Sequence, residues 1–150
     1  LQHLLHFGRR QHGGQPRRVA GPHQPVQPSQ PAIQHLPVQE EQGRERLAAG
    51  MGVIVYPEGT RMAPGQTRKY GVSGALLACE TGAPLVPIAH NSGYFWRRRS
   101  LLKKAGTIRV VIGPPIDPTG LTPREVNERA QQWIEAKVAE IVAAPGGVPR

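Results

Sequence analysis

The sequence predicts one α/β domain preceded by a disordered segment. Short apolar runs rich in β-branched residues alternate with helix-forming stretches across short connections, an element order typical of α/β proteins. Residues 1–39 differ: they contain eight Gln, six Pro, five His and four Arg, but no Asp or Glu. Because frequent prolines prevent a continuous helix or a central strand, we expect residues 1–39 to be disordered. We expect the folded domain over 40–144 and a disordered tail over 145–150.

The first half of the predicted domain reads as helix, strand and helix. Residues 40–52, "EEQGRERLAAGMG", predict a short amphipathic helix that Gly50 stops. The run "VIVY" at 53–56 predicts a short buried strand. A second helix, built from small residues, is predicted over 71–84 and should end near Gly82.

The second half adds two strands and a long helix. "PLVPIAH" at 84–90 predicts a buried strand, and its prolines suggest a strand start or a sheet edge. "TIRVVIG" at 107–113 predicts another strand. The last helix should begin with a capping box, with Thr122 as N-cap, Pro123 at the first helical position and Glu125 two residues further on. Its apolar face recurs at helical spacing through Val126, Ala130, Trp133, Val138 and Ile141.

The net charge of the chain is +9, which favours polyanions as partners: nucleic acid, an anionic membrane surface or phosphorylated small molecules. Its one cysteine, Cys79, excludes an internal disulfide and a multi-cysteine metal site. No apolar run approaches the roughly 18 residues of a membrane-spanning helix, and nothing resembles an export signal. We therefore expect a chain that neither crosses a membrane nor carries an export address.

A carboxylate and a guanidinium follow the first predicted strand. Glu58 and Arg61 lie where that strand ends, and binding sites in open α/β sheets gather at the carboxyl ends of strands. Free backbone N–H groups around Gly59 should hold an anion, and the planar fork of Arg61 fits a phosphate or a carboxylate. Arg68 and Lys69 follow a flexible loop and could close over the same anion. The alternative is that Glu58 and Arg61 simply pair across a tight turn.

The longer pattern points to a family. The block Tyr56–Arg61 reads Tyr-Pro-Glu-Gly-Thr-Arg and is followed by Lys-Tyr-Gly, a small-residue helix and Val-Pro-Ile. Over about half the chain this order resembles the 1-acylglycerol-3-phosphate O-acyltransferases (lysophosphatidate acyltransferases), in which a Phe-Pro-Glu-Gly-Thr-Arg block binds the acceptor phosphate and a later Val-Pro-Ile block lines the acyl-donor side. The resemblance assigns acceptor binding to Glu58, Gly59, Thr60, Arg61 and Lys69, and the acyl side to Val86, Pro87 and Ile88.

The resemblance also implies a fold and a reaction. The fold is that of the glycerolipid acyltransferases, a mixed sheet flanked by helices, of which this chain would hold the C-terminal half. The reaction moves an acyl group from acyl-CoA or acyl-carrier protein to lysophosphatidate, giving phosphatidate in phospholipid biosynthesis at the cytoplasmic face of the membrane. This chemistry requires no metal and no organic cofactor.

The catalytic pair of that family is missing from this sequence. The reaction needs a His and an Asp five positions later, so that the imidazole can take the proton of the acceptor hydroxyl. The only aspartate is Asp117, and no histidine precedes it by five. His35 and Glu40 imitate the spacing, but they flank Pro37 in a proline-rich context. We therefore expect no catalytic residue and no turnover, and interpret residues 1–39 as a truncation or reading-frame artefact.

Aromatic and basic residues gather at 93–109, "GYFWRRRSLLKKAGTIR", with no acid among them. Aromatic rings beside cations suit the interface of an anionic bilayer. We expect Trp96, Arg97, Arg98 and Arg99 to face a membrane surface, which would make the chain peripheral. The alternative is a solvated basic loop with one or two buried rings.

Three other possibilities remain open. His90 could be a general base or a hydrogen-bonded structural residue at a strand end. Cys79 lies on an apolar helix face and reads as inert core rather than as a nucleophile. The chain could also be a basic nucleic-acid- or membrane-binding protein without catalysis. Nothing in it resembles a recognition helix, a zinc finger or an RNA-recognition strand motif, so no specific nucleic acid is expected.

Overall fold

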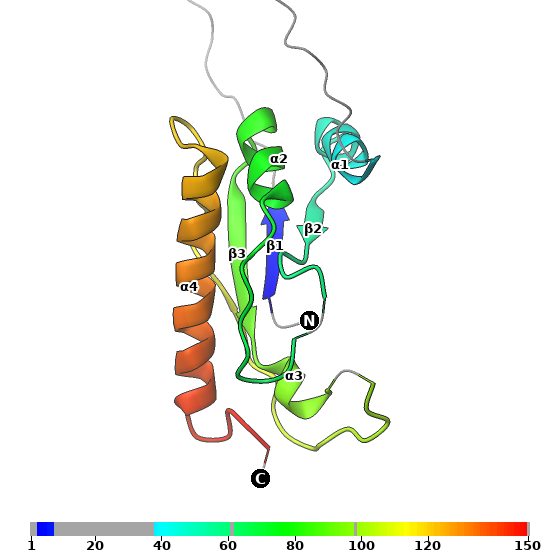
Figure 1. Cartoon of the computed structure of the whole chain (residues 1–150), viewed down its shortest axis with the longest axis vertical. Coiled ribbons are helices and arrows are strands. Elements are labelled where there is room, and N and C mark those ends of the chain that lie inside the picture. Colours follow the sequence, from blue (N-terminus) through cyan, green and yellow to red (C-terminus); the bar gives the residue numbers. More distant parts are fainter. Residues whose placement is uncertain (1–2, 8–37, 61, 98, 150) are drawn as a thin grey trace, which may run out of the picture.

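A computed structural model of the chain describes residues 3–7, 38–60, 62–97 and 99–149 (Figure 1). In chain order the elements are β1 (His3–Phe7), α1 (Val38–Ala48), β2 (Val53–Val55), α2 (Ser73–Thr81), β3 (Leu85–His90), α3 (Ser92–Phe95), β4 (Val110–Ile112) and α4 (Pro123–Ala143).

The strands form one open sheet in the order β2-β1-β3-β4. Helices and strands alternate after β1, so the predicted α/β class is confirmed. The pairs β1–β2, β1–β3 and β3–β4 are all antiparallel, so the mixed pairing implied by the resemblance is not seen among the described strands. The strands β2 and β3 run in the same direction and do not touch, because β1 lies between them.

Strand β1 corrects the prediction that residues 1–39 are disordered throughout. Leu5 is paired with Val55 on one side and with Pro87 on the other, so residues 3–7 form an inner strand of the sheet. The prediction averaged composition over 39 residues, whereas the prolines begin only at Pro16 and "HLLHF" contains none. Residues 8–37 lie outside the described residues.

Strand β3 is an inner strand although Pro87 lies in its middle. The Pro87 carbonyl accepts a hydrogen bond from the Gly113 N–H at 2.8 Å. The nitrogen and carbonyl of one strand residue point to the same side, so the missing donor of Pro87 also faces β4. Strand β4 has already ended at Ile112, and the missing donor therefore interrupts no regular ladder. The expectation that the prolines mark a strand start or an edge fits Pro84 and is wrong for Pro87.

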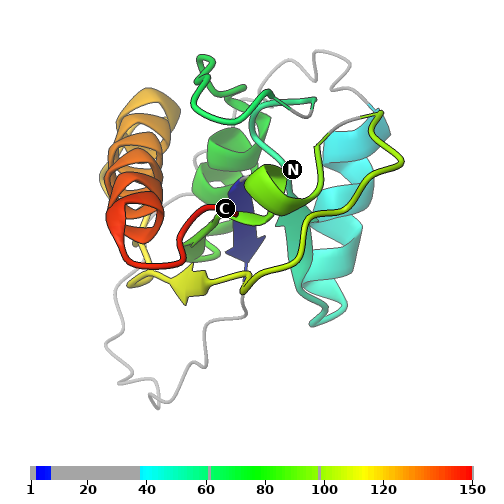
Figure 2. The same ribbon diagram turned by 90° about the horizontal axis from the view of Figure 1, so that it is seen from below.

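Helices α1, α2 and α4 lie side by side on one face of the sheet (Figure 2). Strand β3 alternates between buried and half-buried residues, and the buried set faces α4. Leu85 and Ala89 of β3 belong to the same core cluster as Ala75 and Ala78 of α2. From α4 this cluster takes Val126, Ala130, Ile134 and Ile141, with Trp133 and Val138 partly buried against it.

The sequence signals for helix ends were accurate. Gly82 ends α2 in the left-handed conformation at φ 67°, as expected of a C-terminal glycine. The capping box of α4 is formed, because the Thr122 hydroxyl accepts from the Glu125 N–H and the Glu125 carboxylate accepts from the Thr122 N–H. These local signals fix the start of α4 against the sheet.

The opposite face of the sheet is less covered. Ile54 of β2 and both Val110 and Ile112 of β4 are more than half exposed there. Within the described residues, no helix combines the length and apolar character needed to cross a membrane.

Candidate functional site: a pocket between the Pro57 turn and the Arg68 segment

A tight turn follows β2. The Gly59 N–H donates to the Tyr56 carbonyl at 3.0 Å, which places Pro57 and Glu58 at the two central turn positions. Gly59 has φ 66°, a conformation that favours glycine. The expectation of free turn N–H groups is therefore wrong for Gly59, whose N–H is used within the turn.

A second segment returns to this turn and closes a pocket with it. The Gly71 N–H donates to the Pro57 carbonyl at 2.8 Å, so the chain between these residues forms a closed loop. The two segments enclose an open pocket of about 430 Å³. Its lining combines the turn with the basic pair that follows the loop: Pro57, Glu58, Gly59, Arg68, Lys69, Tyr70 and Gly71.

Three polar residues of α4 hold the basic segment in place. Asn127, Gln131 and Glu135 are four residues apart and therefore lie on one face of the helix. The Asn127 amide donates to the Tyr70 carbonyl at 3.3 Å, and the Gln131 side chain bonds the Arg68 carbonyl and the Tyr70 N–H at 3.4 and 3.5 Å. We call this row of three side chains the α4 clamp.

Tyr70 anchors the same segment through its side chain. It is only 2% exposed, and its hydroxyl donates to the Glu135 carboxylate at 3.3 Å. Burial, and then the negative charges of Glu135 and Glu58, hold the pKa of the phenol well above its ordinary value of 10.0. Tyr70 is therefore a neutral hydrogen-bond donor, and the neighbouring Arg68 and Lys69 are left exposed over the pocket.

The predicted acceptor-binding residues divide into two groups. Gly59 and Lys69 line the pocket at its surface, whereas Glu58 is only 5% exposed and lies close enough to Tyr70 to act on its pKa. Glu58 therefore contributes to the pocket lining from a mostly buried position beside the Tyr70 phenol. Thr60 is half-buried next to the turn, and Arg61 lies outside the described residues.

The predicted acyl-side residues do not share one face. Val86 and Ile88 are half-buried on the less covered face of the sheet, whereas Pro87 is buried on the face covered by α4. None of the three lines the pocket at Pro57. Strand alternation explains the split, since consecutive residues of a strand point to opposite faces.

The aromatic–basic segment exposes two leucines in addition to the predicted aromatic and basic residues. Trp96 is 52% exposed with the Lys103 ammonium 4.4 Å from its ring centroid, and Arg97 and Arg99 are exposed beside it. Leu101 and Leu102 are 99% and 82% exposed. They lie between basic residues in "RRRSLLKK", so the sequence itself indicated their exposure. Arg98 lies outside the described residues.

The remaining candidates take structural positions. The His90 Nδ1 is 3.0 Å from the Ser92 hydroxyl, a local contact across the end of β3. The Cys79 thiol donates weakly to the Leu121 carbonyl at 3.7 Å, and burial raises its pKa, so a reactive thiolate is disfavoured. His35 lies outside the described residues.

The sequence is similar to those of known proteins. No family model matches the sequence. The chain is 44% identical over 104 residues to a 1-acyl-sn-glycerol-3-phosphate acyltransferase of Pseudomonas aeruginosa, covering 67% of this chain and 40% of that protein. It is 27% identical over 92 residues to the human 1-acyl-sn-glycerol-3-phosphate acyltransferase beta, covering 61% of this chain and 33% of the relative. The chain thus spans less than half the length of these curated relatives.

A solved structure shows the same fold. The crystal structure of the 1-acyl-sn-glycerophosphate acyltransferase from Thermotoga maritima superposes with a TM-score of 0.66 at 24% identity. The superposition covers 71% of this chain and 45% of that one. The helices and open sheet described above are therefore part of a known acyltransferase architecture.

Proposed function

The chain belongs to the 1-acyl-sn-glycerol-3-phosphate acyltransferase family, and from that premise we propose that the pocket at Pro57 binds the phosphate of 1-acylglycerol 3-phosphate. In the complete reaction the free hydroxyl of this acceptor would receive an acyl group from acyl-CoA or acyl-carrier protein. The observation that carries the proposal is the convergence of two segments of the family pattern. The glycine of the Pro-Glu-Gly-Thr-Arg block and the Lys69 side chain line one pocket.

The charges around the pocket suit a phosphate. Arg68 and Lys69 are exposed on its rim, and the α4 clamp fixes the backbone that carries them. An anion bound there exchanges water for cationic donors on a held backbone, which costs less ordering than binding to a free loop. Arg61, next to Thr60 in the chain, would add the planar donor fork that phosphate oxygens fit.

The general base is the part of the machinery that this chain does not supply. No His precedes an Asp by five positions in the sequence, and Asp117 accepts from Thr119 within its own turn. We therefore propose that the 150-residue chain binds the acceptor phosphate and does not transfer the acyl group.

Binding of glycerol 3-phosphate, measured by isothermal titration calorimetry, tests the phosphate site. We expect Lys69→Gln and Arg61→Gln each to weaken binding about fivefold, the effect of losing roughly 1 kcal/mol of ion pairing near a surface. Arg129→Gln is the matched control, since it removes an exposed cation from α4 away from the pocket. Equal affinities for all three variants would show that the pocket is not the phosphate site.

Acyl transfer tests the second half of the proposal. Radiolabelled acyl-CoA and lysophosphatidate are incubated with the purified chain, with Arg61→Ala and with His35→Ala. We expect no labelled phosphatidate from any of them. Turnover that Arg61→Ala abolishes would contradict the missing base while supporting the phosphate site, and its loss in His35→Ala would identify the base.

We further propose that the exposed segment at 96–102 faces an anionic bilayer. Trp96, Leu101 and Leu102 supply apolar surface, and Arg97 and Arg99 supply charge, a combination that favours the membrane interface. Flotation with phosphatidate-containing vesicles should fall for Leu101→Ser with Leu102→Ser and should be weak with neutral vesicles. Steeply salt-dependent binding to arbitrary DNA without vesicle binding would favour the nucleic-acid alternative instead.

A further inference from the structure

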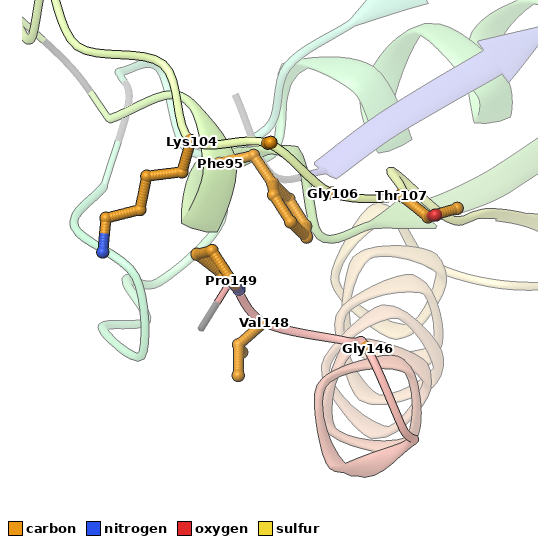
Figure 3. A pocket seen from close by; sticks show the side chains of 8 residues that line it. Phe95, Lys104, Gly106, Thr107, Gly146, Val148 and Pro149 are labelled. Carbon is orange, nitrogen blue, oxygen red and sulfur yellow. The ribbon is translucent and has the colours of Figure 1, made fainter.

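A second pocket lies between α3, the loop after it and the end of the chain (Figure 3). Its volume is about 560 Å³, within the range of roughly 300–1,000 Å³ in which proteins bind small ligands. It shares no lining residue with the pocket at Pro57. The residues around it are Phe95, Lys104, Ala105, Gly106, Thr107, Gly146, Val148 and Pro149.

The walls of this pocket are fixed by hydrogen bonds that join the two sides. Asn91 is fully buried; its amide donates to the Gly147 carbonyl at 2.8 Å and its side-chain oxygen accepts from the Arg109 N–H at 2.8 Å. The Arg109 guanidinium donates to the Pro145 carbonyl at 2.6 Å. The end of the chain is therefore tied to the loop that forms the opposite wall, which corrects the expectation of a disordered tail for residues 145–149.

The interior of the pocket is apolar. The Phe95 side chain enters from α3, Pro149 lies opposite it at the end of the chain, and Val148 adds apolar surface next to Pro149 (Figure 3). A side chain at Gly106 would collide with the Phe95 ring, so glycine at this position lets the loop lie directly against it. Val148 is 41% exposed, so part of this apolar wall is open to water.

The rim of the pocket is cationic. Lys104 is exposed beside the apolar lining, and the sequence from Trp96 to Arg109 contains no acid. Its neighbour Lys103 lies over the Trp96 ring. An apolar cleft with a cation at one side complements a ligand that has a hydrocarbon chain and one anionic end.

We propose that this second pocket binds a single-chain anionic amphiphile of the fatty-acid type. The hydrocarbon chain packs against Phe95, Val148 and Pro149, and the carboxylate pairs with Lys104. A route from the bilayer rests on the membrane face proposed above, since the strongly exposed Leu101 and Leu102 lie in the same loop as Lys104. This site goes beyond the proposed function, since it involves neither the acceptor phosphate nor a thioester.

Calorimetric titration of the full 150-residue chain with monomeric dodecanoate, below its micelle concentration, tests the site. We expect saturable one-to-one binding that Lys104→Gln weakens about threefold to fivefold, the range of a single ion pair near a surface, and that Lys104→Arg restores. Val148→Asp should weaken binding further, because it places a charged group beside the hydrocarbon chain and repels the carboxylate of the ligand. Arg129→Gln loses the same charge elsewhere and should bind as the unmodified chain does. Each variant is first checked for an unchanged Tm.

Besides dodecanoate binding that does not depend on Lys104, two outcomes would overturn the site. One is equal affinity for dodecyltrimethylammonium, which has the same chain and the opposite charge. The other is the same loss in Lys104→Gln and Arg129→Gln. Glycerol 3-phosphate is titrated alongside, and its affinity should not change in Lys104→Gln. Failure of glycerol 3-phosphate to bind would count against the phosphate site alone, while Lys104-independent dodecanoate binding would count against this pocket alone.

Discussion

At the scale of single residues, Tyr70 connects the basic segment to the core. Its ring is buried, its hydroxyl reaches Glu135, and its backbone is held on both sides by Asn127 and Gln131. The backbone on both sides of Lys69 is therefore held while its side chain is exposed. A sequence shows Lys-Tyr-Gly but does not show that the tyrosine points inward while the lysine points outward.

Replacing Tyr70 with Phe removes only the hydroxyl. We expect a loss of about 1 kcal/mol in the free energy of unfolding at pH 8, the usual contribution of one hydrogen bond. Because the pKa of the folded phenol is raised, its contribution to stability is complete below the ordinary value of 10.0 and is lost as the pH rises above it. The free energy of unfolding measured in urea should therefore fall between pH 8 and 10.5 in the unmodified chain. It should fall by less in Tyr70→Phe. Equal alkaline losses in both would contradict this role of the phenol.

At the scale of elements, α4 performs two tasks with two faces. Its apolar residues pack on β3 and α2, while the α4 clamp holds the segment that carries Arg68 and Lys69. The apolar spacing predicted the first face. The polar residues Asn127, Gln131 and Glu135 have the same periodicity, yet spacing alone does not distinguish a solvated polar face from one that holds another segment.

The α4 clamp predicts an effect on binding from a residue outside the pocket. Gln131→Leu removes both bonds to the Arg68–Tyr70 backbone, so the segment should become more mobile and glycerol 3-phosphate should bind about threefold more weakly. The control is Gln132→Leu, which makes the same change at the next, exposed position of α4. Calorimetric affinity and Tm are measured together. A lower Tm with unchanged affinity would make Gln131 structural only.

The start of α4 predicts an acid-dependent effect. The Thr122 N–H, and then its hydroxyl, donate to Glu125 and hold the pKa of this carboxyl below its ordinary value of 4.5. The stabilisation is present above pH 4.5 and is lost as the pH falls through the lowered pKa of the folded chain. Glu125→Gln should therefore have a lower Tm at pH 7, and the difference should shrink on acidification. A difference that stays constant down to pH 3 would argue against the ionised cap.

At the scale of the whole molecule, the arrangement of the sheet depends on five residues near the beginning of the chain. Strand β1 separates β2 from β3 and pairs with both. In its absence these two strands would each present an unpaired edge, a feature that promotes aggregation. The length of β1 is small, but its position is central.

A proline in β1 tests this position. Leu5→Pro removes one backbone donor from an inner strand, and we expect a loss of about 2–3 kcal/mol from the hydrogen bond left unmade, with a Tm lower by roughly 10 °C or more. Leu5→Val is the control, because it keeps the donor and favours strands. Thermal unfolding followed by far-ultraviolet circular dichroism gives both values. A Tm of Leu5→Pro equal to that of Leu5→Val would mean that β1 contributes little.

The sequence was sufficient where structure is determined locally and insufficient where it depends on distant partners. Gly82 and the Thr122–Glu125 box mark helix ends within a few residues, and both were read correctly. The sequence did not predict β1, because the proline-rich residues that follow it dominate the composition of this region. Its strand partners are also about 50 and 80 residues away. Pro87 was misread for a related reason: where β4 ends beside it cannot be known from the residues around it.

The pairing of β1 also has a consequence for the order of events on the ribosome. Leu4 is paired with Ile88, 84 residues later (88 − 4), so β1 is synthesised well before its partner β3. At about 5–20 residues per second, that interval is roughly 4–17 s. During this interval β1 can pair only with β2, so its other edge stays unpaired and is available to chaperones or to other nascent chains. The time during which this chain is vulnerable is therefore set by the position of five residues.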